Sequence, residues 1–275
     1  MRMGLDVAQQ RMPFAEVVSR AQFAEGLGFD GVWGFDHFKP MYGEGVGECF
    51  EGMSTLAALS GVTERVRLGL LVAGFTYRPI GLFAAQALTI DHASNGRLEL
   101  TLGAAWFEQE HKALALPFPP TGERVAMFDE ALTVLRGLLT QENYSFEGAF
   151  YTIEDATLYP HGVQQPHPPI WVGATQPRMI GIAARHADVW HSFGPAEWLA
   201  DKAQLLSERA ELAGRDPASI MHAGSLSIEG DWDDVRKAAG AFRDGGFGYL
   251  VVGWPGEGRT RVEEFVRVAM PDFTS

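Results

Sequence analysis

The stretch that decides the fold runs from Arg65 to His111 and reads RVRLGLLVAGFTYRP, then IGLFAAQALTIDHASNG, then RLELTLGAAWFEQEH. Its first and third segments contain apolar runs bounded by glycine or proline, as strands covered on both faces do. The middle segment has the pattern of an amphipathic helix. Strands that alternate with helices indicate a parallel sheet, and such sheets place ligands at the carboxyl ends of their strands. The stretch therefore predicts both the fold class and the edge of the sheet that carries the chemistry.

The same alternation continues along the chain and gives eight strand–helix units without a linker or a change of composition. A (β/α)8 barrel needs about 250 residues, so a single α/β TIM barrel domain over residues 1–275 accounts for the whole sequence. An open doubly wound sheet is the weaker alternative, because no strand leads into a G-x-G-x-x-G helix start. The expected strands are Met1–Val7, Phe29–Trp33, Val66–Val72, Leu98–Leu102, Ile170–Val172, Val189–Ser192, Met221–Ile228 and Tyr249–Val252.

The composition excludes several classes of function. The hydrophobic fraction of 46% is enough for a large core, and the net charge of −13 argues against nucleic acid or an anionic membrane as a partner. Cys49 is the only cysteine, so no disulfide can form within the chain and a reducing cytoplasm is the expected location. No apolar run approaches the roughly 20 residues of a membrane span. Metal-binding motifs such as HExxH and CxxC are absent, so we expect a small molecule as the ligand and no metal.

Two pairs of residues are candidates for acid–base catalysis. Asp36 and His37 follow the second strand, and histidine exchanges protons near neutrality. The alternative is that Asp36 only orients His37 or caps a turn, although the carboxyl end of a barrel strand favours catalysis. Glu108 and Glu110 follow the fourth strand, where negative charge also favours a helix N-terminus. That structural explanation is preferred for Glu110, whereas Glu108 stays a catalytic candidate.

Small residues at the ends of the third and fourth strands are candidates for contact with a flat ligand. Val72, Ala73 and Gly74 would let such a ligand touch the backbone, although a plain turn or bulge explains them equally well. Trp106 follows the fourth strand and offers an aromatic wall beside the same space. These four residues are predicted to bind a cofactor.

The turn after the fifth strand is a candidate anion site. Free amides at the start of the following helix, with the hydroxyl of Thr175 and with Arg178, would suit a phosphate group, and ordinary capping is the alternative. After the sixth strand, Trp190 could close the same pocket, and His191 could either join it or be a satisfied core histidine. The candidate residues of this region are Gly173, Ala174, Thr175, Gln176, Trp190 and His191.

Six segments together resemble the luciferase-like superfamily of flavin and deazaflavin oxidoreductases. They are GFDGVWGFDHF, ERVRLGLLVAGFTYRP, TIDHASNGRLELTLGAAWFEQEH, PFPPTGER, QQPHPPIWVGAT and AARHADVWH. They look most like the deazaflavin-dependent branch, whose members use coenzyme F-420. The resemblance implies a (β/α)8 barrel with the cofactor ring over the strand ends and with Asp36 and His37 beside it. It also implies a bulge at Ala73 and Gly74, which in the family often carries a non-prolyl cis peptide.

The resemblance further implies reversible hydride transfer between F-420 and a small organic substrate, with His37 exchanging the accompanying proton. Members of the family are commonly homodimers, and the loops 39–48 and 141–167 would shape the substrate pocket. The chain departs from the family at the turn after the fifth strand, which reads Gly-Ala-Thr-Gln-Pro over residues 173–177. Two alternatives stay open: an FMN-dependent monooxygenase on the same barrel, and a cofactor-free barrel that acts as a binding protein.

Overall fold

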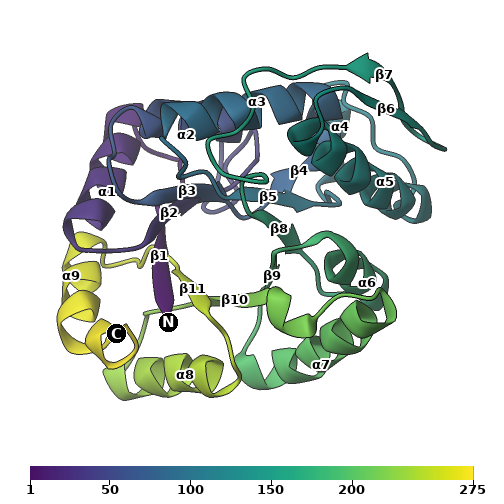
Figure 1. Cartoon of the computed structure of the whole chain (residues 1–275). Coiled ribbons are helices and arrows are strands. Elements are labelled where there is room, and N and C mark those ends of the chain that lie inside the picture. Colours follow the sequence, from purple (N-terminus) through teal and green to yellow (C-terminus); the bar gives the residue numbers. More distant parts are fainter. Residues whose placement is uncertain (275) are drawn as a thin grey trace.

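The computed structural model describes residues 1–274 and shows a ring of parallel strands surrounded by helices (Figure 1). The described strands neighbour one another in the order β3-β2-β1-β11-β10-β9-β8-β5-β4. The expected α/β barrel is therefore confirmed. Ser275, the last residue of the expected domain, lies outside the described residues. The strands are β1 (Arg2–Asp6), β2 (Gly31–Gly34), β3 (Arg67–Leu70), β4 (Ala73–Gly74), β5 (Leu100–Gly103), β8 (Ile170–Gly173), β9 (Val189–Ser192), β10 (Met221–Leu226) and β11 (Tyr249–Val252).

One strand of the barrel is broken into two pieces. β3 pairs with β2 and β4 pairs with β5, so these two short strands together occupy one place in the ring. Leu71 and Val72 separate them and are joined by a cis peptide bond. The sequence predicted one continuous strand that ends at Val72. A parallel bridge between Leu68 and Leu98 closes the ring on the amino-terminal side of the break, which leaves eight places as the strand count predicted.

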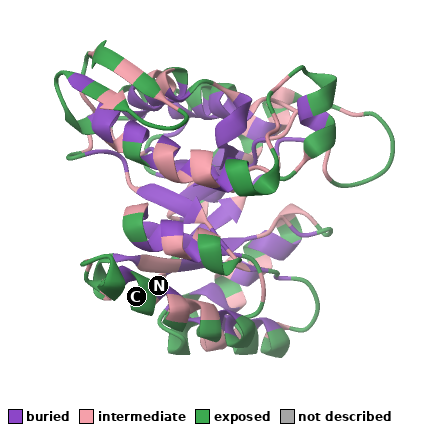
Figure 2. Ribbon diagram, turned by 90° about the vertical axis from the view of Figure 1, so that its right-hand side faces the viewer, coloured by how far each residue is buried: buried purple, intermediate pink, exposed green. Residues whose placement is uncertain are grey.

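Helices cover the outside of the ring and turn their apolar faces inward, so that buried residues concentrate in the centre of the molecule (Figure 2). In α8, for example, Val235, Ala239 and Phe242 are buried, at the four- and three-residue spacing of one helix face. None of the helices formed by residues 1–274 is both long and apolar enough to cross a membrane. The helices are α1 (Phe14–Gly26), α2 (Gly52–Ser60), α3 (Ile80–Ala93), α4 (Glu108–Ala113), α5 (Thr121–Thr140), α6 (Pro177–His186), α7 (Ala196–Leu212), α8 (Trp232–Asp244) and α9 (Arg259–Val268).

The inside of the barrel is filled by three large aromatic side chains. The ring centroids of Trp33 and Trp171 lie 4.5 Å apart, and Tyr249 lies 5.7 Å from Trp33 and 5.2 Å from Trp171. Gly4 and Gly69 make room for them, because a Cβ atom at either position would overlap the Trp33 ring. The barrel interior is thus a packed core, and a ligand can approach only from an end of the barrel.

A two-stranded hairpin lies outside the ring. It consists of β6 (Tyr144–Glu147) and β7 (Thr152–Ala156), which pair in antiparallel fashion. Figure 1 shows it at the periphery of the molecule, next to α5. The alternating sequence YSFEGAFYTI over residues 144–153 is typical of such a hairpin.

Candidate active site

Two adjoining hollows open at the carboxyl ends of the barrel strands. The smaller, which we call the slot, has a volume of about 280 Å³ and lies over the ends of β4, β5, β8 and β9. The larger, which we call the cavity, has a volume of about 890 Å³ and lies over the ends of β1, β2, β10 and β11. Four residues line both hollows and so mark their junction: His37, Leu71, Trp106 and Phe193.

The imidazole of His37 is held by a buried carboxylate. Nδ1 of His37 lies 2.8 Å from Oε2 of Glu110, whose side chain is 2% exposed. The other oxygen of Glu110 accepts hydrogen bonds from the amides of Phe38 and Lys39, at 2.8 and 3.0 Å. The hydroxyl of Tyr77 donates to Oε2 at 2.8 Å. Three consecutive residues of the loop that carries His37 are therefore tied to α4 through this carboxylate.

These contacts decide which nitrogen of His37 is free. Burial raises the pKa of Glu110, but the hydrogen bonds from His37, Phe38 and Tyr77 outweigh it and lower the pKa overall. The carboxylate is thus ionised near neutrality and can only accept hydrogen bonds, so Nδ1 of His37 must carry a proton. Nε2 has no hydrogen bond to another described residue and is left free to accept or return a proton at the junction.

Asp36 lies next to His37 in sequence but performs a different task in the structure. Both of its oxygens contact the guanidinium of Arg78, at 2.7 and 2.9 Å, and Oδ2 also accepts a hydrogen bond from the amide of Gly74 at 3.0 Å. No hydrogen bond joins it to His37 among the described residues. Asp36 lines the slot but is fully engaged by these partners. Its contacts are those of a residue that positions Gly74, rather than of the catalytic group that the sequence predicted.

The acidic residues after β5 are arranged contrary to expectation. Glu108 is 55% exposed at the start of α4, pairs with Lys112 at 2.8 Å, and lines neither hollow. The catalytic assignment of Glu108 is therefore not supported, because its side chain points away from the site into solvent. Glu110, two residues further along α4, is instead the buried partner of His37. Helix periodicity explains the difference, since residues two positions apart face nearly opposite sides.

Trp106 stands at the mouth of both hollows, as the sequence predicted for an aromatic wall. Its side chain is 66% exposed, and its ring centroid lies 5.7 Å from that of His37. It stacks on Phe107 at 5.0 Å. An open aromatic face next to His37 can cover a flat ligand in the slot.

The floor of the slot is made by the break in the barrel strand. Val72, Ala73 and Gly74 all line it, as predicted. Gly103 and Gly173 leave space for the side chain of Val72, because a Cβ atom at either position would press on it. The small residues at the ends of β5 and β8 thus make room for Val72 as well as for a ligand.

The predicted cofactor residues after β8 and β9 divide into two groups. Ala174, Thr175 and His191 line the slot together with Gly173. Trp190 does not, because it is fully buried behind the strands and donates a hydrogen bond from Nε1 to the carbonyl of Ala174 at 2.8 Å. Gln176 also lies outside the slot, exposed before α6, and Arg178 donates to the carbonyl of Gly122 at 3.0 Å.

His191 is a buried histidine with an unmet hydrogen bond. Its Nε2 atom lies 3.1 Å from the hydroxyl of Ser225, whereas Nδ1 is buried and has no partner among the described residues. Burial lowers the pKa of His191 to about 3, so the ring is neutral at working pH. Thr175 and Ser192 share a hydrogen bond of 3.1 Å beside it. This end of the slot therefore offers neutral polar groups to a ligand.

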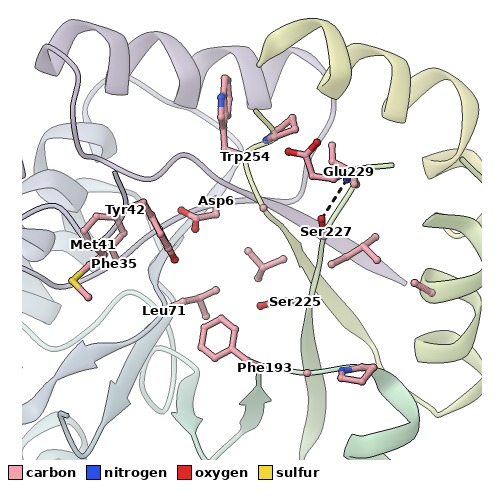
Figure 3. A pocket seen from close by; sticks show the side chains of 18 of the residues that line it. Asp6, Phe35, Met41, Tyr42, Leu71, Phe193, Ser225, Ser227, Glu229 and Trp254 are labelled. Atoms are coloured by element: carbon pink, nitrogen blue, oxygen red, sulfur yellow. Dashed lines mark hydrogen bonds between the residues drawn. The ribbon is translucent and has the colours of Figure 1, made fainter. Parts of the chain in front are cut away.

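The cavity is lined mainly by apolar and aromatic side chains (Figure 3). Met41 and Tyr42 reach it from the loop 39–48, as expected, but no described residue of 141–167 lines either hollow. The expectation for that second segment is therefore wrong, because the hairpin packs outside the ring. Residues 1–274 hold no cluster of three or more His, Cys, Asp or Glu placed to bind a metal ion.

Sequence reasoning missed two carboxyl groups at the carboxyl end of the barrel. Glu110 was assigned to a helix terminus, and Asp6 was not considered, although it ends β1 and lines the cavity. The argument that selected Asp36, an acid at the carboxyl end of a barrel strand, could also have selected Asp6. No signal in the spacing could have paired Glu110 with His37, because 73 residues separate them.

A family model described as luciferase-like monooxygenase matches residues 1–267. The chain belongs to the luciferase-like monooxygenase family. One relative, the FMNH2-dependent dimethylsulfone monooxygenase of Pseudomonas putida, is 29% identical over 218 residues, which cover 79% of this chain and 59% of that protein. Another, the F420-dependent glucose-6-phosphate dehydrogenase of Intrasporangium calvum, is 35% identical over 191 residues, which cover 68% of this chain and 56% of that protein. The chain thus spans less than two thirds of the length of these relatives.

Two solved structures share the fold. An F420-dependent secondary alcohol dehydrogenase superposes with a TM-score of 0.90 at 17% identity, covering 100% of this chain and 99% of that one. The coenzyme F420-dependent tetrahydromethanopterin reductase of Methanopyrus kandleri superposes with a TM-score of 0.86 at 17% identity, covering 99% of both chains. At this identity the likeness shows the fold alone.

Proposed function

We propose that this luciferase-like protein is an oxidoreductase that binds the deazaflavin coenzyme F-420 in the slot and transfers hydride between it and a small organic molecule in the cavity. The observation that carries the proposal is the position of His37. Its imidazole lies at the junction of the two hollows, with Nδ1 fixed by Glu110 and Nε2 free. A proton-exchanging group belongs between a hydride carrier and its substrate, since reduction of a polar bond needs a proton as well as a hydride.

The polar groups of the slot fit the edge of a deazaflavin ring. Nδ1 of His191 is buried without a partner, and a buried polar atom of this kind is stabilised when a ligand supplies the missing hydrogen bond. The floor at Val72–Gly74 is backbone, against which a flat ring can lie closely. Trp106 can cover the ring from the mouth.

The start of α6 suits the phosphate-bearing tail of the cofactor. Pro177 occupies the first turn, and Gln176 makes no side-chain capping bond, so the amides of this turn are free to bind an anion. Thr175 and Met179 line the slot on either side of this turn, which places the helix start at its end. The predicted anion site would thus consist of these amides and the hydroxyl of Thr175, without a contribution from the guanidinium of Arg178.

The residues around the slot would have different roles in the reaction. Bound F-420 supplies a ring carbon that donates or accepts hydride. His37 gives or takes the accompanying proton through Nε2, while Glu110 stabilises the imidazole in one orientation. Asp36 accepts the amide of Gly74, and Arg78 holds Asp36, so that the floor of the slot stays in place. The protein thus orients ring and substrate and provides the proton.

An FMN-dependent monooxygenase is the second candidate. The sulfone monooxygenase relative supports it, because its match covers a larger share of this chain than that of the glucose-6-phosphate dehydrogenase, 79% against 68%. Both cofactors carry a flat three-ring system and a phosphate, so the same slot would serve either. The choice therefore depends on measured affinity.

Titration of the purified protein with F-420 and, separately, with FMN tests the proposal by following the fluorescence of each cofactor. We expect saturable binding of F-420 that is tighter than binding of FMN. Tight binding of FMN without binding of F-420 would establish the monooxygenase alternative instead. A folded protein that binds neither would support the cofactor-free barrel.

A further inference from the structure

The cavity contains a carboxyl group, that of Asp6, which forms no ion pair with the residues that line the cavity. Asp6 ends β1, and Figure 3 shows its side chain within the cavity, near Tyr42 and Trp254. Oδ1 accepts a hydrogen bond from the amide of Ala8 at 2.9 Å, and Oδ2 has no hydrogen-bond partner among the described residues. Burial raises the pKa of Asp6 to about 6, against a smaller opposing effect of the Ala8 amide and of Arg20. Such a carboxylate is stabilised by any ligand that brings it a positive charge.

No lysine or arginine lines the cavity beside Asp6. The residues that line the cavity include the carboxylates of Asp6 and Glu229 but no lysine or arginine. The guanidinium of Arg20 lowers the pKa of Asp6 slightly, but it pairs with Glu16 at 3.1 Å and lies 3.8 Å over the ring of Trp254. Arg20 is not itself part of the lining. The lining therefore carries acidic groups without a lysine or arginine among them, and a low-dielectric wall concentrates the field of such groups.

Aromatic rings surround the same space. Phe35, Tyr42 and Phe193 line the cavity, and the last two are largely exposed to it or to solvent. The faces of aromatic rings attract positive charge. The volume of about 890 Å³ is that of a site for a whole small molecule rather than for an ion alone. The cavity thus combines an anionic anchor, aromatic walls and room for an apolar body.

We propose that the substrate is an organic cation, namely a molecule with an apolar body and a protonated amine whose ammonium group pairs with Asp6. This inference rests on the proposed function in that it takes the cavity as the place of the substrate. It separates this chain from the relatives that are named for glucose 6-phosphate, because a phosphate ester would face two carboxylates and no cation here. The ammonium group would bind at Asp6 while the apolar body reaches toward His37 at the junction.

A matched series of probes tests the charge preference without knowledge of the natural substrate. Phenylpropylamine, phenylpropanol and phenylpropionate share one apolar body and differ in charge. Their affinities for the full chain are measured by calorimetry or protein NMR at about pH 8, where Asp6 is ionised and the amine is protonated. We expect the amine to bind about tenfold more tightly than the alcohol, and the carboxylate to bind most weakly.

Two variants locate the preference within the cavity. Asp6→Asn keeps the oxygen that accepts from Ala8 but removes the charge, so the affinity for the amine should fall about tenfold and that for the alcohol should stay. Glu229→Gln is the matched control, because Glu229 is exposed and its carboxylate accepts from the amide of Gly256. It should change the affinity for the amine by less than about threefold. Circular dichroism checks that both variants are folded.

The outcomes separate this proposal from the proposed function. Tighter binding of phenylpropionate than of phenylpropylamine, or an amine preference that survives in Asp6→Asn, overturns the cation site. The F-420 titration is run on the same preparations. Binding of F-420 without an amine preference overturns the cation site alone, whereas an amine preference that depends on Asp6 in a protein that does not bind F-420 supports the cation site and overturns the proposed function.

Discussion

Glu110 and His37 lie 73 positions apart in sequence, and their side chains meet at 2.8 Å where α4 approaches the loop after β2. The carboxylate also binds the amides of Phe38 and Lys39 and the hydroxyl of Tyr77. Four donors therefore converge on one buried group. This arrangement makes Glu110 the residue that sets the orientation and the free nitrogen of His37.

Replacement of Glu110 by Gln should lower turnover by about tenfold to a hundredfold, because the imidazole loses its fixed orientation. Affinity for the cofactor should change little, since Glu110 does not line the slot. Steady-state kinetics with the pH profile of kcat make the measurement, and the profile should move because the proton on Nδ1 loses its acceptor. Glu108→Gln is the control, and it should leave the profile unchanged.

The same variant has a pH-dependent effect on stability. The pKa of Glu110 is lower in the folded protein than in the unfolded chain, so its stabilisation is complete above the unfolded pKa and disappears as pH falls through the folded pKa. Glu110→Gln should therefore cost about 1–3 kcal/mol near neutrality, because buried donors lose their acceptor. Urea unfolding should show that the difference from wild type shrinks on acidification. A difference that grows instead would contradict the ionised state of Glu110.

Replacement of His37 by Gln should lower turnover by about 10²–10⁴-fold, the range for loss of a general acid–base group. The fluorescence titration with F-420 should be nearly unchanged, because the floor and walls of the slot remain. His92→Gln is the control, since His92 is exposed and, among the described residues, its side chain forms a hydrogen bond with the carbonyl of His161 alone. Full turnover in His37→Gln would remove the proposed proton exchange.

The sequence predicted the barrel more completely than the site, and particular residues show why. The strands can be recognised from local sequence, because a mostly apolar run such as Val66–Val72 indicates a buried strand whichever elements pack against it. The partners of Asp36 and His37 come from segments far along the chain, so spacing does not encode them. For Asp36 the deciding partner is Arg78, which leaves no free oxygen for catalysis. For His37 it is Glu110, whose own position in α4 looked like an ordinary helix start.

The packing inside the barrel could not be predicted from the sequence either. Trp33 and its glycine partners are far apart along the chain, and no pattern indicates that they are in contact. Gly69→Ala should destabilise the protein by about 1–3 kcal/mol or more, since the new methyl group overlaps the Trp33 ring. Gly240→Ala is the matched control in α8, where nothing lies near the new methyl group. It should stabilise the helix by about 0.5–1 kcal/mol. Chemical unfolding of both variants makes the comparison.

We propose that α2 and α3 form the contact of a homodimer. The groove between them is lined by apolar residues that include Met53 and Leu82, and Leu82 is 52% exposed. Oε1 of Gln86, in the same groove, is buried without a described partner. Leu82→Glu should shift the protein from dimer to monomer in light scattering, whereas the control Leu212→Glu on exposed α7 should not. A wild-type protein that is monomeric at all concentrations would contradict this contact.

Asp6 should destabilise the fold in the absence of a cationic ligand. Its pKa is raised from 3.8 to about 6, so the folded protein holds the proton more tightly than the unfolded chain, and stability falls as pH rises through this window. The full effect is about 3 kcal/mol, and we expect about 1–2 kcal/mol because water in the cavity reaches the carboxyl. Asp6→Asn should therefore be more stable than wild type at about pH 8 and equal to it below about pH 4. Urea unfolding across this range, with Glu229→Gln as the control, makes the measurement. Saturating phenylpropylamine should raise the stability of wild type but not that of Asp6→Asn. If Asp6→Asn is less stable than wild type at about pH 8, the carboxylate of Asp6 already has a favourable partner in the folded protein.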